Sequence, residues 1–111
     1  MEERQGLGYV TREEIRNLTG LTDLEIDDQS LDQIIIDAEN LIEAYTGKTW
    51  TTTDAEYPKI QTVTRLLAAS LIYEGLPSTP EAQGKAQRYH ELATLMLKSM
   101  RVFSSGPLKR T

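Results

Sequence analysis

SLDQIIIDAENLIEAYTG, residues 30–47, is the stretch that does most to decide the fold of this chain. Its apolar residues recur at steps of three and four, the spacing of one face of an α-helix. They are Leu31, Ile34, Ile35, Ala38, Leu41, Ile42 and Tyr45. Ser30 is a suitable N-cap with Gln33 at the capping-box position, and Gly47 can adopt the left-handed conformation that ends a helix. The pattern predicts an amphipathic helix over 30–46 whose apolar stripe holds the protomer together.

One isoleucine does not belong to this stripe. Ile36 falls on the far side of the helical wheel, among Asp32, Asn40 and Glu43. Single exposed isoleucines are common on protein surfaces, but burial of one at an interface contributes about 1.5–3 kcal/mol. We therefore predict that this acidic face, with Ile36 at its centre, meets a neighbouring molecule.

Capping signals predict two further helices before residue 77. Thr11 is a suitable N-cap with Glu14 at the capping-box position, so a short helix is expected over 11–19. Residues 58–76 begin with a proline, which the first turn of a helix tolerates. From Leu66 onward this segment is apolar on nearly all sides, which is typical of a helix surrounded by neighbours.

A fourth helix is predicted over 80–103. Its apolar stripe includes small residues at 82, 86 and 93, which let a partner helix approach closely. The remaining ends, 1–8 and 104–111, are expected to be flexible arms. The chain is therefore expected to be all-α, a single domain of about four helices that spans 1–111.

The charges of the chain are divided between its two halves. The sequence has 17 acidic and 12 basic residues, a net charge of −5. Residues 1–57 hold fourteen of the acids and four basic residues, whereas 58–111 hold three acids and eight basic residues. Net acidity argues against a protein whose main task is to grip nucleic acid. The two halves can neutralise each other within one chain, or the acidic half of one copy can face the basic half of the next in head-to-tail assembly.

Composition also restricts the compartment. There is no cysteine, which excludes disulfides, thiolate chemistry and cysteine zinc sites. The N-terminal sequence MEERQGLGYV lacks the apolar core of a signal peptide, and no run of residues approaches the length of a membrane span. An intracellular origin is expected, with no membrane partner.

No group of residues suggests catalysis. His90 is the single histidine and lies at the edge of the apolar stripe of 80–103, which is more typical of a structural residue than of a base or ligand. Asp23, Glu25 and Asp27 alternate as in a calcium loop, but Asp28 stands where that loop needs glycine, and its final glutamate is missing. We expect no enzymatic activity, no catalytic residue, no cofactor and no metal site.

Two features outside the helix faces are candidate contact sites. Trp50 follows the predicted helix 30–46, and it is expected either to plug the end of the core or to anchor a neighbouring subunit. Lys98, Arg101, Lys109 and Arg110 make the C-terminal part basic. This basic part supports an alternative function: a small cytoplasmic helical domain, regulatory or DNA-associated, that binds through its C-terminal half.

Two stretches carry a family resemblance: DAENLIEAYTGKTW (37–50) and YPKIQTVTRLLAASLIYEGLP (57–77). The first contains a Tyr-Thr-Gly signature at 45–47. The second begins near Pro58, is rich in leucine and alanine, and reaches the pair Tyr73 and Glu74. Together with the Tyr-Val-Thr start at 9–11, they resemble the head–tail connector, or head-completion adaptor, proteins of tailed double-stranded DNA phages and prophages. The likeness covers about residues 9–77 and is less clear for the fourth helix and the basic tail.

The resemblance implies a non-enzymatic virion protein, made in the host cytoplasm and located at the head–tail junction. Members of this family form a homo-oligomeric ring, commonly of about a dozen copies, between the portal protein and the tail or stopper proteins. Double-stranded DNA passes through such a ring without sequence-specific binding. An acidic lumen would suit this passage because carboxylates repel phosphates.

Overall fold

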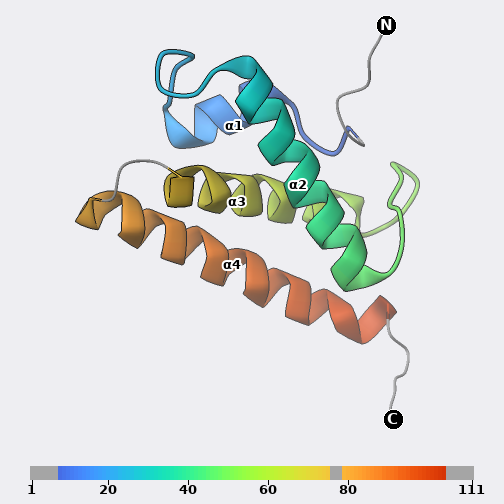
Figure 1. Ribbon diagram of the computed structural model, residues 1–111. Coiled ribbons are helices and arrows are strands. Elements are labelled where there is room, and N and C mark those ends of the chain that lie inside the picture. The colour runs from blue at the N-terminus through green and yellow to red at the C-terminus, as the bar shows by residue number, and fades with distance from the viewer. Residues whose placement is uncertain (1–7, 76–78, 105–111) are drawn as a thin grey trace, which may run out of the picture.

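The third helix of the chain lies at the centre of the molecule, between the first two helices and the fourth (Figure 1). The computed structural model describes residues 8–75 and 79–104, with side chains as far as Ser99. Within these ranges the chain forms α1 (Arg12–Thr19), α2 (Asp28–Thr46), α3 (Tyr57–Gly75) and α4 (Pro80–Ser104), and no strand. The predicted all-α fold of four helices is confirmed. The predicted arms lie outside the described residues, apart from Gly8 and from Ser104, which ends α4.

α3 packs against each of the other helices, whereas α1 and α4 make no contact with each other in the described part of the chain. α3 and α4 run antiparallel and side by side (Figure 1). The buried residues of α3 point in several directions around its axis, as predicted for a surrounded helix. They are Ile60, Val63, Thr64, Leu67, Ala68, Ala69, Ser70, Ile72 and Tyr73. α3, rather than α2, is therefore the element against which the rest of the chain is packed.

The short helix α1 has the predicted capping box. The Thr11 hydroxyl accepts from the backbone N–H of Glu14 at 3.2 Å, and the Glu14 carboxylate accepts from the backbone N–H of Thr11 at 2.9 Å. Val10 and Ile15 are both buried on either side of this cap, which fixes the angle at which the chain enters the helix. Gly20 ends α1 with a left-handed φ of 75°.

α2 begins earlier than predicted, and the expected Ser30 cap is wrong. Asp27 is the N-cap, and its carboxylate accepts a hydrogen bond of 2.8 Å from the backbone N–H of Ser30. An aspartate also suits the positive end of the helix dipole, so Asp27, three residues before Ser30, is the favoured cap. Gln33 forms no capping box but donates to Asp37 at 3.0 Å. Gly47 ends the helix as predicted, with a φ of 79°.

The buried face of α2 coincides with only one side of the predicted apolar stripe. It consists of Leu31, Ile35, Ala38, Glu39 and Ile42. Leu41 and Tyr45 at the other edge are 49% and 41% exposed, so the prediction that the whole stripe holds the protomer together is wrong at these two positions. Glu39 takes their place in the interior because its carboxylate accepts a hydrogen bond of 3.1 Å from the backbone N–H of Tyr9.

Small residues bring α4 close to α3. Ala86 and Ala93 are buried in this contact, and the Ser70 hydroxyl of α3 donates a hydrogen bond of 3.0 Å to the carbonyl oxygen of Ala86. The close approach predicted from the alanines of α4 is confirmed. The partner helix belongs to the same chain.

Candidate interaction surfaces

Two of the acids on the predicted acidic face of α2 bind residues of the same protomer. Asp32 accepts two hydrogen bonds of 2.7 Å from Nε and Nη2 of Arg12 in α1, a bidentate pair. This guanidinium holds the pKa of the Asp32 carboxyl below its usual value. Glu43 accepts a hydrogen bond of 3.3 Å from the Tyr9 hydroxyl. These two carboxylates therefore fasten α1 and the segment before it to α2.

The other two members of that face remain accessible. Asn40 is exposed, and Ile36 is partly buried. Ile36 is not among the described side chains that pack against the hydrophobic core. The accessible part of the predicted acidic face therefore consists of Ile36 and Asn40 rather than of the acids.

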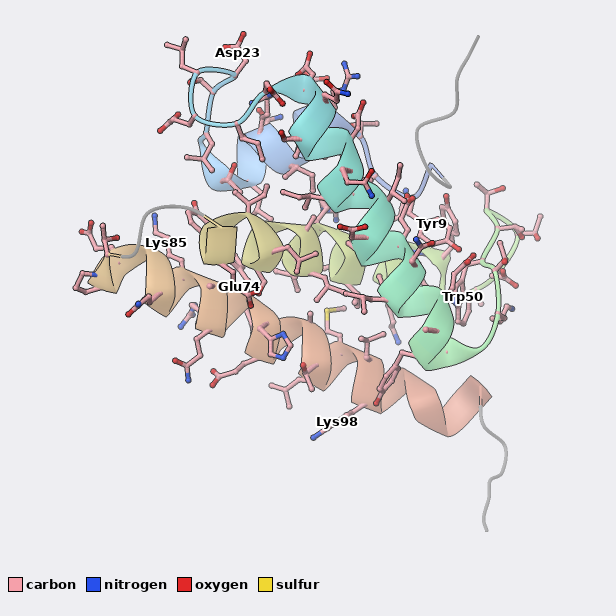
Figure 2. The ribbon with its side chains drawn as sticks, in the orientation of Figure 1. Tyr9, Asp23, Trp50, Glu74, Lys85 and Lys98 are labelled. Carbon is pink, nitrogen blue, oxygen red and sulfur yellow. The ribbon has the colours of Figure 1, made fainter. Side chains whose placement is uncertain are left out.

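Trp50 closes one end of the core and lies next to Tyr9 (Figure 2). Only 7% of its surface is exposed, and its indole Nε1 donates a hydrogen bond of 3.0 Å to the Thr46 hydroxyl. The Lys48 ammonium lies 4.3 Å from the centroid of the indole ring, a cation–π contact. Trp50 was predicted either to plug the end of the core or to anchor a neighbouring subunit, and this packing matches the first role.

The basic C-terminal residues are described only in part. Lys98 is exposed, and its side chain extends from α4 away from the other helices (Figure 2). Arg101 belongs to α4, but its side chain lies outside the described residues, as do Lys109 and Arg110 altogether. Nearer the start of α4, the Lys85 ammonium lies 5.3 Å from the ring centroid of Tyr73.

The acidic connector, residues 21–27, holds two of its carboxylates, those of Glu25 and Asp27, in local hydrogen bonds. Glu25 accepts from the backbone N–H and the hydroxyl of Thr22, at 2.8 and 3.0 Å. These donors lower the pKa of Glu25, and the backbone N–H of Ser30 lowers that of Asp27 in the same way. The described residues contain no group of three or more His, Cys, Asp or Glu that could hold a metal ion.

Several large apolar side chains lie on the surface at positions that the helix patterns did not indicate. Leu24, in the acidic connector, is 94% exposed, and Leu95 on α4 is 64% exposed. Leu24 lies in a turn, so helical periodicity does not predict its exposure. Leu95 and the partly exposed Leu92 lie off the apolar stripe of α4. An apolar residue outside the stripe of an amphipathic helix is the sequence feature that indicates an exposed position.

An apolar groove lies between α2 and α4, where the predicted stripe of α2 is uncovered. Its volume is about 270 Å³. It is lined by Leu41 and Tyr45 of α2, Leu67 of α3, and His90, Ala93, Thr94 and Leu97 of α4. His90 is exposed at this groove, so the single histidine borders an apolar surface.

No protein-family model, no curated protein and no solved structure gives a significant match to the chain. In the described part of the chain, no helix combines the length and the apolar character needed to cross a membrane. A proposal of function therefore rests on the surfaces described above and on the resemblance of residues 9–77.

Proposed function

We propose that this chain is a non-enzymatic structural adaptor of a virion. It would assemble as a homo-oligomeric ring at the head–tail junction, between the portal and the tail or stopper proteins, and DNA would pass through the ring. The observation that carries the proposal is the position of two unlike surfaces on opposite sides of the protomer. Figure 2 shows Asp23 of the acidic connector on one side and Lys98 of α4 on the other.

The ion pairs favour contacts between copies over neutralisation within one chain. Arg12 and Arg16 of the acidic half bind aspartates of that same half, and so does Lys48. Among the described side chains, two pairs join the halves, from Lys59 to Glu56 and from Arg65 to Glu14. Among the side chains that the structure describes, none on α4 takes part in an ion pair. The acidic excess of residues 1–57 is thus not cancelled by α4, whose described side chains carry three basic and two acidic groups.

A protomer with different surfaces on opposite sides associates head to tail. Such contacts generate a ring when the rotation between neighbours closes, and an open filament when it does not. A ring is the assembly that the resemblance to head–tail connectors implies. α1, α2 and α3 correspond to the stretch 9–77 that carries this resemblance.

Light scattering coupled to size-exclusion chromatography tests the proposal. The protein is measured alone at high concentration and together with the portal protein of the genome that encodes it. We expect a closed oligomer in at least one of these two conditions, since docking on the portal can order an assembly that free protomers do not form. A strict monomer that binds neither the portal nor the tail proteins would refute the proposal.

The alternative, a DNA-associated domain, depends on the basic C-terminal half. Over the described side chains of α4, Lys85, Arg88 and Lys98 exceed Glu81 and Glu91 by one charge, so this surface is only weakly basic. DNA binding that weakens with salt, and that is lost when Lys98, Arg101, Lys109 and Arg110 are neutralised, would favour the alternative.

A further inference from the structure

The short helix α1 is joined to α2 and α3 by a group of ion pairs. Four of the six ion pairs between described side chains involve α1. They join Arg12 to Asp28 and Asp32, Arg16 to Asp28, and Arg65 of α3 to Glu14. Their distances from nitrogen to oxygen lie between 2.7 and 3.4 Å. Charge therefore has a larger part in the attachment of α1 than in that of α4, whose described side chains form no ion pair.

Apolar packing of α1 is limited to one side chain. Among its 8 residues, all of which the structure describes, Ile15 alone is buried. The Tyr73 hydroxyl of α3 adds one hydrogen bond of 3.1 Å to the carbonyl oxygen of Thr19. A helix this short does not persist alone in water, because isolated helices below about 12–15 residues are marginal. α1 would therefore unwind once it left its place on α2 and α3.

The ion pairs of α1 lie near the surface, where salt weakens them. The side chains of Arg12 and Asp28 are 41% and 55% exposed, and that of Asp32 is 19% exposed. Charges this accessible attract each other only modestly in water. Their attraction falls further as the Debye length shortens, from about 10 Å at 0.1 M salt to about 3 Å at 1 M. The attachment of α1 therefore depends on ionic strength.

The chain on each side of α1 is anchored separately. Tyr9 and Val10 are buried before the helix, and Leu21 and Ile26 pack against the core after it. These anchors do not have to give way when α1 leaves its place. Opening can therefore stay confined to residues 11–20, which are α1 and its two caps.

We infer that residues 11–20 form an ion-paired clasp, which opens and unwinds as one unit while α2, α3 and α4 stay folded. Opening separates Asp28 and Asp32 from their arginines. Asp32 belongs to the acidic face of α2 that was predicted to meet a neighbour, so the closed clasp withholds part of that face and salt favours its release. The inference goes beyond the proposed function, because it concerns the protomer itself and does not require a ring.

Amide hydrogen exchange followed by NMR tests the clasp on the parent protein. The backbone N–H groups of Ile15 and Gly20 donate to carbonyl oxygens within the clasp, and the amides between them report its opening. We expect all of these amides to share one free energy of opening, lower than that of Ala68, which is fully buried in α3. Raising NaCl from about 0.1 M to about 1 M should increase the opened fraction of the clasp about threefold or more, with rates referred to an unstructured peptide at the same salt.

Arg12→Gln tests whether the ion pairs hold the clasp closed. The substitution removes the pairs to Asp28 and Asp32, so it should raise exchange in the clasp about threefold or more in about 0.1 M salt and reduce the response to salt. Lys48→Gln is the matched control. It removes the ion pair of 3.1 Å to Asp54, which lies outside the clasp, and should leave exchange in the clasp as in the parent.

Three results would overturn the inference. Equal opening free energies for the clasp and for Ala68 would mean that α1 opens only when the whole fold unfolds. Values that change gradually along α1 would mean that the helix frays from one end instead of opening as a unit. Exchange that responds to neither salt nor Arg12→Gln would mean that ion pairs do not hold the clasp. The salt series uses the parent protein, so the test does not depend on the folding of a variant.

Discussion

The hydroxyl of Tyr9 lies 2.8 Å from the backbone nitrogen of Trp50, which is 41 positions further along the chain and donates a hydrogen bond to it. The Tyr9 ring packs edge-to-face on Tyr57 at the start of α3, with centroids 5.8 Å apart. The carbonyl oxygen of Tyr9 accepts from the Gln61 amide at 3.2 Å. One residue thus joins the segment before α1, the loop after α2 and the first turns of α3.

We expect Tyr9→Phe to destabilise the fold. Without the hydroxyl, the buried N–H of Trp50 has lost its acceptor, and an unsatisfied buried group costs about 1–3 kcal/mol. Urea unfolding followed by tryptophan fluorescence measures the change in the free energy of unfolding. Tyr57→Phe is the control because the aromatic pair needs its ring and not its hydroxyl. Equal stability of Tyr9→Phe and the parent protein would show that water replaces the lost acceptor.

The pair of Asp32 and Arg12 predicts a loss of stability in acid. The pKa of the Asp32 carboxyl lies below its usual value because Arg12 binds the ionised form. A carboxyl whose pKa is lower in the folded state adds stability above its unfolded pKa, and this contribution disappears as the pH falls through the folded value. The free energy of unfolding should therefore decrease below about pH 4, near the pKa of an unfolded aspartate.

Substitution of Asp32 isolates this contribution. Asp32→Asn should be less stable than the parent at neutral pH, and the difference between the two proteins should shrink by about pH 3, because the carboxyl of the unfolded parent is protonated below its unfolded pKa. Urea unfolding at both pH values provides the measurement. Asp23→Asn, in the exposed turn of the acidic connector, is the control. A difference between Asp32→Asn and the parent that is unchanged in acid would mean that the carboxylate charge contributes nothing.

The order of helices was predictable because each is bounded by local chemistry. Thr11, Gly20 and Gly47 act on backbone groups within a few residues of themselves, so their roles can be derived from neighbouring positions. The N-cap of α2 was predicted wrongly for the same reason. Ser30 is a good cap, but Asp27 lies three residues before it and accepts a hydrogen bond from its backbone N–H. When two good N-caps lie within one turn of each other, local sequence signals do not show which of them the helix uses.

The faces of the helices were harder to predict because they depend on where other elements pack. Leu41 lies on the apolar stripe of α2, yet it is exposed, and the charged Glu39 is buried. Glu39 enters the core through a hydrogen bond to Tyr9, 30 positions away, and no local pattern contains that information. The exposed Leu24 and the groove beside Leu41 were missed for the same reason, since both arise from the arrangement of the helices.

The contact between α3 and α4 should be intolerant of bulk. Ala86 of α4 is buried, and its carbonyl oxygen accepts a hydrogen bond from Ser70 of α3, so Ala86→Leu places extra methylene groups in this close contact, at a cost of about 1–3 kcal/mol. Thermal unfolding followed by circular dichroism would detect it. Ala44→Leu, at an exposed position of α2, adds the same side chain without crowding and should leave the stability nearly unchanged. A tolerated Ala86→Leu would show that α4 can move away from α3.

The outer face of α2 gives a prediction about assembly rather than folding. Ile36 is only partly buried and does not pack against the core among the described residues. We expect Ile36→Asp to change the free energy of unfolding by no more than about 1 kcal/mol, as at other surface positions, and to weaken assembly on the portal. Urea unfolding and light scattering on the same preparation separate the two effects.

Asn40→Asp is the matched control for Ile36→Asp, because it adds one charge to the same face at an exposed position without removing an apolar group. If both substitutions weaken assembly alike, charge repulsion rather than loss of the isoleucine is responsible. If neither does, this face of α2 meets no neighbour and assembly depends on other surfaces. If Ile36→Asp unfolds the monomer, Ile36 belongs to the core, and the division of α2 into a packed face and a contact face is wrong.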